Sequence, residues 1–210
     1  MKIILINFTL LIIILSSCSS AKVRNYYDPA QDFSKLNSIA ILPLRNSFVQ
    51  TNTSLNTGDM IEINKMFQQE FIKKNPRLKV SDSKSSTELL NKNQLVEPYA
   101  NMLSTFHQTG IPNTDILKKI GTLINADAIF QGFVTECIQN DGVYGRVNAE
   151  TSVKVRYILF STSTGSVIWE ATCEGQKKLG TLGNAPPISE VLTKIKKNLI
   201  PAIPVLSNLK

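Results

Sequence analysis

The longest regular pattern in this chain is an alternation of apolar and polar residues over residues 146–161. Successive side chains of a strand point to opposite faces, so one face of this segment is apolar and the other is charged. The apolar set is Val147, Ala149, Thr151, Val153, Val155, Tyr157 and Leu159, and the polar set is Arg146, Asn148, Glu150, Ser152, Lys154 and Arg156. The pattern predicts the central strand of an antiparallel sheet with one wet face.

Two further strands flank this segment in the sequence. Residues 126–138 precede it across the turn signal of residues 139–142, and residues 166–174 follow it after Thr164-Gly165. Short connections with turn residues are typical of neighbouring antiparallel strands. The three segments therefore predict an antiparallel meander.

A strand, a helix and a second strand are predicted earlier in the chain. The apolar run 38–44 favours a buried strand, and residues 77–81 favour a short strand. Between them, residues 59–74 place apolar side chains at helical spacing, and Pro76 ends the helix. This order favours a parallel pair of strands with a helical crossover.

Four more helices complete the prediction. Residues 82–96, 98–108 and 112–125 have helical character, and a last helix spans about 189–200. The fold class is thus predicted as α/β, with a mixed sheet of about five strands, the meander near the end and a C-terminal helix.

The first 17 residues predict a lipoprotein signal peptide. Lys2 precedes an apolar run, and two serines lead into Cys18. The run 3–15 is shorter than the roughly 20 residues of a membrane-spanning helix, although an uncleaved anchor is the alternative. A small-small-Cys ending resembles a lipobox, so we expect a lipid on Cys18. Ser19 after it favours the outer membrane, with the protein facing the periplasm.

The mature chain divides into two parts in this interpretation. Residues 18–37 form a lipidated N-terminus with a short polar leader, and residues 38–210 form one periplasmic domain. Tyr26, Tyr27 and Phe33 are unusual in a pure tether. We expect these leader residues to make contacts, either with their own domain or with a partner.

Catalytic and metal-binding motifs do not emerge from the sequence, so we expect no enzyme activity, no metal and no cofactor. His107 is the sole histidine, and a solvated or helix-capping role is the simplest interpretation. Glu136 and Glu174 lie near the ends of two strands that flank a third. They could approach as a carboxylate pair, but solubility of the sheet edge is the commoner explanation.

Two cysteines remain after Cys18. If the meander is correct, Cys137 pairs near Asn148 and Cys173 near Lys154, on opposite edges of the central strand. Strands two apart lie about 9.5 Å from each other. Because a disulfide needs α-carbons within about 7 Å, we expect two free, buried thiols.

The net charge of +7 is spread over pairs of lysines near the ends of predicted helices. Complementation of helix dipoles explains these pairs, and contact with anionic lipid or cell-wall polymer is the alternative. The chain lacks the interleaved aromatic and basic residues of an RNA-binding protein, so no nucleic-acid partner is expected.

Three short motifs carry a family resemblance. They are a strand ending in Pro43, the segment Asn125-Ala126-Asp127 before a strand, and Thr164-Gly165 followed by Trp169. In this order they resemble the periplasmic domain shared by the curli secretion lipoprotein CsgG, the penicillin-binding-protein activator LpoB and related lipoproteins. Asn125 stands where glycine is usual in that family.

The resemblance implies an α/β fold and a role in the cell envelope. The chain lacks the membrane hairpins of a CsgG-like channel, and its leader is shorter than an LpoB-like tether. The favoured function is a non-enzymatic outer-membrane lipoprotein that binds an envelope protein as an assembly or regulatory adaptor. The alternative is a homo-oligomeric subunit of an outer-membrane secretion or export complex, and an enzyme acting on cell-wall polymer comes third.

Overall fold

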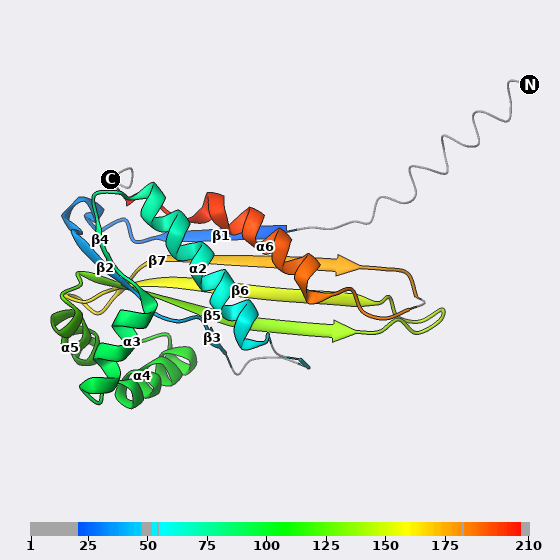
Figure 1. The fold of residues 1–210 in the computed structure, drawn as a ribbon, viewed down its shortest axis with the longest axis horizontal. Helices are drawn as coiled ribbons and strands as arrows, with labels where there is room; N and C mark the ends of the chain where they lie inside the picture. The colour runs from blue at the N-terminus through cyan, green and yellow to red at the C-terminus, as the bar shows by residue number, and fades with distance from the viewer. Residues whose placement is uncertain (1–20, 48–51, 54, 182, 207–210) are drawn as a thin grey trace, which may run out of the picture.

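A computed structural model describes residues 21–47, 52–53, 55–181 and 183–206. These residues form a mixed sheet with helices on both faces (Figure 1). The strands are β1 (Ala21–Tyr27), β2 (Ser38–Ile41), β3 (Arg45–Asn46), β4 (Lys79–Ser81), β5 (Ala128–Asn140), β6 (Glu150–Ser161) and β7 (Val167–Lys178). The helices are the 3-10 helix η1 (Phe33–Lys35) and the α-helices α2 (Thr57–Lys74), α3 (Ser83–Lys92), α4 (Val96–Thr109), α5 (Thr114–Ile124) and α6 (Ile188–Ala202).

The sheet has the order β1-β7-β6-β5-β2-β4, with β3 also paired to β5. The pairs β1/β7, β7/β6 and β6/β5 are antiparallel, and the pairs of β2 and β3 with their neighbours are parallel. The predicted fold class, the meander and the C-terminal helix are confirmed. The sheet contains seven strands instead of about five, because β1 and β3 were not anticipated.

There is a physical reason why the sequence pattern did not predict either of these two strands. The segment expected as a polar leader supplies β1, which lies at the edge of the sheet and is mostly exposed. An edge strand needs no apolar face to be held by its ladder of hydrogen bonds. Strand β3 has only two residues, both exposed, which is too short for any alternation to be visible.

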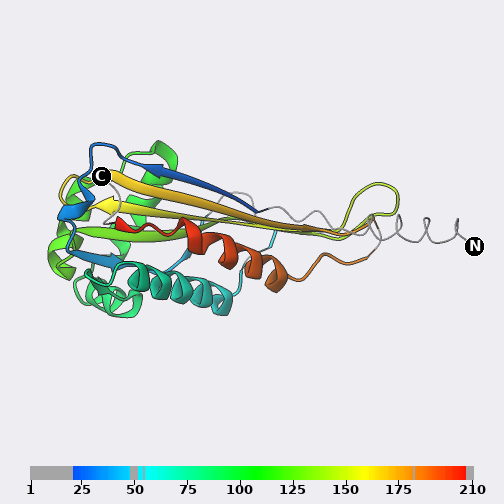
Figure 2. The same ribbon diagram turned by 90° about the horizontal axis from the view of Figure 1, so that it is seen from above.

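One face of the sheet is covered along its length by α2 and α6 (Figures 1 and 2). Phe67 of α2 stacks on Tyr157 of β6 with ring centres 3.9 Å apart, and Phe130 of β5 meets the edge of the same Phe67 ring at 5.1 Å. From α6, Val191, Ile195 and Leu199 are fully buried in this core. Aromatic rings bury large apolar areas, so they dominate the cohesion of this layer.

The opposite face is covered only at one end, by α3, α4 and α5 (Figure 2). This second core contains Ala40, Leu42, Ile129, Phe133, Ile158 and Phe160 of the sheet with Leu90, Tyr99, Met102, Leu103, Phe106, Leu117 and Ile120 of the helices. Gln131 is a fully buried polar residue in this layer, and it donates to the carbonyls of Pro43 and Gly132 and accepts from the Tyr99 hydroxyl. Its hydrogen bonds offset the cost of burial.

The hairpin between β5 and β6 differs from the sequence prediction. Strand β6 begins at Glu150, and its first residue pairs with Asn140 at the end of β5. A turn closed by mutual backbone hydrogen bonds between Val143 and Val147 lies beyond these strand ends. The connection is therefore longer than the four-residue turn that we expected, and this shifts the register of the whole pair.

Candidate partner-binding face

The uncovered half of the sheet's second face is the feature that most favours binding. Along β6, the buried Ile158 and Phe160 give way to Arg156, Lys154 and Ser152. The Arg156 guanidinium carbon lies 5.7 Å from the centre of the Phe106 ring of α4, at the boundary between the halves. We define the open face by nine residues from four strands: Arg24, Tyr26, Glu136, Ser152, Lys154, Arg156, Glu170, Thr172 and Glu174.

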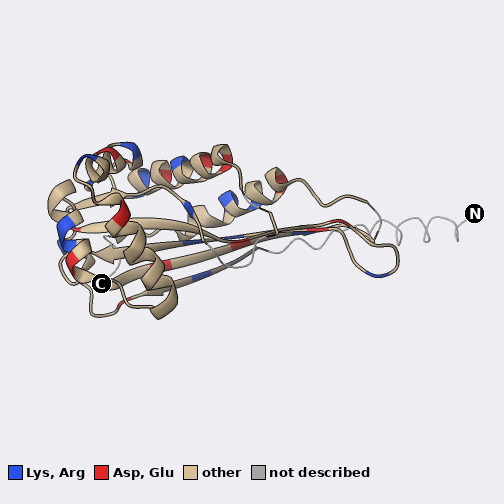
Figure 3. Ribbon diagram, turned by 90° about the horizontal axis from the view of Figure 1, so that it is seen from below, with Lys and Arg blue, Asp and Glu red and all other residues tan. Residues whose placement is uncertain are grey.

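Five charged side chains on the open face make ion pairs with one another. Arg156 binds Glu170 through two contacts, Nε to Oε1 at 2.8 Å and Nη2 to Oε2 at 2.6 Å. Lys154 Nζ lies 3.5 Å from a carboxylate oxygen of Glu136 and 3.8 Å from one of Glu174. Two parallel bonds from one guanidinium fix direction as well as charge. The face therefore presents charges of both signs, and the view from below in Figure 3 likewise shows basic and acidic residues interspersed over the helices and strands.

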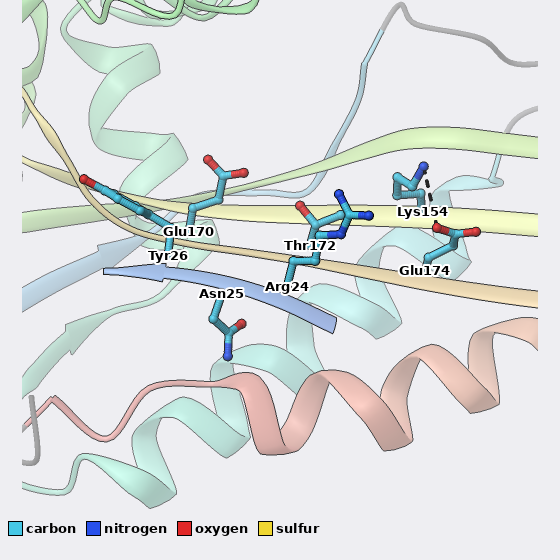
Figure 4. A pocket seen from close by; sticks show the side chains of 7 residues that line it. All are labelled: Arg24, Asn25, Tyr26, Lys154, Glu170, Thr172 and Glu174. Atoms are coloured by element: carbon cyan, nitrogen blue, oxygen red, sulfur yellow. Dashed lines mark ion pairs between the residues drawn. The ribbon is translucent and has the colours of Figure 1, made fainter. Parts of the chain in front are cut away.

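A hollow of about 360 Å³ lies where the edge strand meets this face. Figure 4 shows Arg24 and Tyr26 of β1 on the same side of the sheet as Glu170, Thr172 and Lys154, whereas Asn25 points to the other side. Tyr26 is 51% exposed. The hollow is lined by polar groups and one aromatic ring, which suits contact with a protein surface.

Glu136 and Glu174 do not form the carboxylate pair that we had considered. The Lys154 ammonium lies between them, and Ser152 donates its hydroxyl hydrogen bond to Glu136 at 2.8 Å. Both glutamates therefore contact the Lys154 ammonium on β6 instead of each other. The three strands thus carry a Glu-Lys-Glu row across the sheet.

The two cysteines are free and fully buried, as predicted. Their registers differ from the prediction: Cys137 lies opposite Val153, and Cys173 lies opposite Val155. The longer β5–β6 connection accounts for the first difference, and the irregularity between Leu159 and Phe160 in the β6/β7 pair accompanies the second. Burial raises the pKa of each thiol to about 11, so both are protonated at neutral pH.

His107 is half-buried, so the expectation of a solvated side chain was wrong. Its ring centre lies 4.5 Å from that of Phe133, and its Nε2 atom is buried without a hydrogen-bond partner in the described part of the chain. Burial lowers the pKa of His107, and the positive charge of Arg156 lowers it further. The apolar face of α4 extends to its last turn, which the helical period alone did not reveal.

The leader residues have different positions. Phe33 is only 3% exposed and belongs to the core under α2 and α6. Tyr26 and Tyr27 lie at the end of β1 and remain partly exposed, and only Tyr26 belongs to the open face. Neither the phenol of Tyr26 nor Arg24 was assigned to a face from the sequence. The sequence does contain one signal for the open face: Glu170, Thr172 and Glu174 alternate with buried residues along β7.

The segment Asn125-Ala126-Asp127 joins three elements at the covered end. Asn125 ends α5 with φ of 55°, a left-handed conformation that glycine and asparagine tolerate, which explains why either residue fits. Asp127 Oδ2 accepts hydrogen bonds from the backbone N–H groups of Asn37 and Ser38 at 2.8 and 2.9 Å. The Thr162 hydroxyl donates to the carbonyls of Ala126 and Asp127, both at 2.8 Å.

The motif of Thr164-Gly165 and Trp169 forms the turn between β6 and β7 and the first part of β7. Gly165 has φ of 75°, and a Cβ there would lie 2.3 Å from Thr114 Oγ1, so only glycine fits. The Thr164 hydroxyl lies 2.7 Å from that of Ser166. Trp169 is fully buried, with its ring centre 5.5 Å from that of Phe130. The residues of both motifs therefore have structural roles, in a helix end, a turn and the core.

Cys18 and Ser19, on which the anchoring prediction depends, lie outside the described residues. Among the residues that the structure describes, no helix is long and apolar enough to cross a membrane. The same part of the chain contains no cluster of three or more histidine, cysteine or acidic residues that could hold a metal ion.

Comparisons with known proteins give structural neighbours only. No protein-family model and no curated protein matches the chain. The PelC dodecamer from Paraburkholderia phytofirmans is 17% identical, covering 87% of this chain and 96% of that one, with a TM-score of 0.45. Lipoprotein GNA1162 from Neisseria meningitidis is 16% identical, covering 80% and 97%, with a TM-score of 0.42.

The LpoB C-terminal domain from Escherichia coli is also similar. It is 12% identical, with 69% of this chain and 82% of that one covered and a TM-score of 0.40. These likenesses are distant, and they concern the arrangement of helices and strands. The resemblance to CsgG that the motifs suggested stays a prediction.

Proposed function

We propose that this chain is a non-enzymatic lipoprotein, attached to the outer membrane through a lipid on Cys18, that binds another envelope protein as an assembly or regulatory adaptor. The observation that carries the proposal is the open face. A sheet that packs helices over one half of a face leaves the other half available to a partner. The proposed orientation is towards the periplasm.

The chemistry of the open face favours a protein as the partner. Three carboxylates there, Glu136, Glu170 and Glu174, would repel the phosphates of a nucleic acid. The hollow is lined almost entirely by polar and charged side chains, whereas small molecules are usually bound in pockets lined mainly by hydrophobic and aromatic side chains. Fixed charges of both signs suit a surface with the opposite arrangement, which gives specificity and correct register.

The lipid anchor has a direct test. In the Cys18→Ala variant we expect acyl labelling to stop and the protein to leave the membrane fraction, because the acyl chains supply the membrane affinity. Full retention of Cys18→Ala in membranes would contradict the anchor. The Ser19 residue favours the outer membrane, so fractionation of native membranes tests the location as well.

Partner binding is tested by photo-crosslinking from inside the open face. A photo-reactive residue replaces Thr172 on the open face, and a matched control replaces Thr193, which is exposed on α6. We expect one discrete protein adduct from Thr172 and none from Thr193. Equal adducts, or none from either position, would contradict binding through this face.

The composition of that adduct also separates the two envelope roles. An adduct with a different protein supports the adaptor. An adduct with a second copy of this chain, together with a large homo-oligomer in mild detergent, supports the alternative role as a subunit of a secretion or export complex. The anchor at Cys18 is common to both roles.

A further inference from the structure

The hairpin beyond β5 and β6 exposes apolar side chains at the tip of the sheet. Val143 is 50% exposed, Tyr144 is 78% exposed and Val147 is 47% exposed, and Leu179 beside them is 40% exposed. Tyr144 is the most exposed large apolar side chain in the described part of the chain. A cluster of exposed apolar side chains at the end of a domain is typical of a site that contacts a membrane or another protein.

The tip is an ordered structure. Val143 and Val147 exchange two backbone hydrogen bonds of 2.8 and 3.0 Å, which close the turn. The backbone N–H of Gly142 donates to the Gly183 carbonyl at 2.9 Å, and that of Leu179 donates to the Ala149 carbonyl at 2.8 Å. These bonds tie the hairpin to the chain that leaves β7, so the apolar side chains are held outward.

The start of β1 points the upstream chain toward this same end. β1 is antiparallel to β7, and Ala21 lies opposite Gly175, three residues before the end of β7 at Lys178. The first described residue therefore faces the hairpin tip, as Figures 1 and 2 show. The residues at the level of Lys178 are Glu150 and Asn140, and the tip lies beyond them.

The short segment between Cys18 and the start of β1 limits the distance between the hairpin tip and the lipid. Cys18 precedes Ala21 by three residues, which span at most about 11 Å. The distance along β7 from Gly175 to Lys178 is about 10 Å. A lipid on Cys18 thus reaches about the level of Lys178, whereas Val143 lies three residues past Asn140 and extends up to about 10 Å further. The interfacial layer of a bilayer is only roughly 5–8 Å thick on each side.

We infer that the hairpin tip formed by Val143, Tyr144, Val147 and Leu179 inserts into the interfacial layer of the membrane that holds the lipid of Cys18. Tyrosine is favoured at that depth, because its ring is apolar and its hydroxyl stays hydrated. Arg146, which is exposed in the turn between Val143 and Val147, suits the phosphate groups of phospholipids. The contact would stand the sheet upright on the membrane, with the open face projecting sideways.

This inference rests on the proposed lipid attachment, so the experiment monitors both. The full-length lipidated protein is reconstituted in liposomes of phosphatidylethanolamine and phosphatidylglycerol with brominated acyl chains, which quench nearby tryptophan. Tyr144→Trp places a reporter at the tip. The matched control is Ile111→Trp, which is also an exposed apolar position (71%) and lies at the opposite end of the sheet, three residues before Thr114.

Both variants retain the buried Trp169 as a common background. We expect Tyr144→Trp to lose about half of its emission, because one of its two tryptophans lies within 5–10 Å of the acyl boundary. Ile111→Trp should lose almost none. Flotation with the liposomes and acyl labelling are measured on the same samples, and they report the anchor.

Each remaining outcome overturns the inference in a distinguishable way. Equal quenching of the two variants in protein that floats would overturn the tip contact and leave the proposed anchor intact. Protein that is not acylated and does not float would overturn both. A photo-reactive residue at Tyr144 that yields a protein adduct instead of a lipid adduct in native membranes would assign the tip to a protein partner.

Discussion

The two halves of the sheet's second face share strands β5 and β6 but differ in what these strands present. Under α3, α4 and α5, β6 presents Ile158 and Phe160, which are fully buried. In the open half, the same strand presents Lys154 and Arg156, paired with glutamates of its neighbours. The period of two is unchanged between the halves. The difference teaches that one strand can build a core at one end and a binding surface at the other.

The largest effect is expected in the covered half. Ile158→Ala removes a fully buried side chain between β6 and the helices, so it should lower the free energy of unfolding by about 2–5 kcal/mol. Urea denaturation followed by circular dichroism measures the change. A loss below about 1 kcal/mol would mean that the helices are not packed on this half.

The junction at Asp127 should come next. Asp127→Ala leaves the backbone N–H groups of Asn37 and Ser38 without their acceptor, at a cost of about 2–3 kcal/mol. Asp127→Asn is the matched variant, since its amide oxygen can still accept both bonds, and it should lose less. Equal losses in the two variants would show that the hydrogen bonds to Oδ2 do not stabilise the start of β2.

Substitutions in the open half should barely change stability. Lys154→Ala breaks two partly exposed ion pairs, which contribute about 0–1 kcal/mol. We therefore expect an unfolding curve close to that of the unaltered protein. A loss comparable to that of Ile158→Ala would indicate that the Glu-Lys-Glu row is a structural element of the sheet, and the contrast between the halves would fail.

The buried thiols provide a check of the core shared by both halves. In the Cys18→Ala background, Cys137 and Cys173 should resist alkylation at neutral pH and react fully in denaturing urea, because their pKa values of about 11 and their burial suppress the thiolate. Mass spectrometry counts the labels. Rapid labelling of the folded protein would show that the layer under α6 opens locally.

The smallest effect concerns His107, at the boundary between the halves. Burial lowers its pKa in the folded state, so the unfolded chain binds more protons below about pH 6.5. The contribution to stability is present above that pH and is lost as the pH falls through it towards the folded-state pKa. His107→Gln should flatten the slope of unfolding free energy against pH in this window, and an unchanged slope would contradict the assignment.

The sequence predicted the parts of the fold that repeat a period. The alternation in 146–161 and the helical spacing of Phe67 and Phe71 depend on burial of one face, which leaves a trace in residue type. The edge strand β1 and the two-residue β3 are held mainly by backbone hydrogen bonds, which any side chain permits. Residue types therefore could not reveal them.

Only part of the candidate site could be predicted from the sequence, for the same reason. The polar side of β6 was visible, including Lys154 and Arg156, but its partners were not. Whether Glu136 meets Glu174 or a lysine depends on the registers of both strand pairs, and each pair contains an irregularity that shifts its register. The contribution of Arg24 depends on β1 joining β7, which follows from tertiary pairing alone.

The most direct test of the account measures the yield of the Thr172 photo-adduct in native membranes after charge reversal. Lys154→Glu reverses a charge on the open face, and Lys65→Glu makes the same change on the exposed side of α2. If the open face binds the partner, Lys154→Glu reduces the adduct by about tenfold, the equivalent of about 1.4 kcal/mol, and Lys65→Glu leaves it unchanged. Equal yields from both variants would contradict binding through the open face.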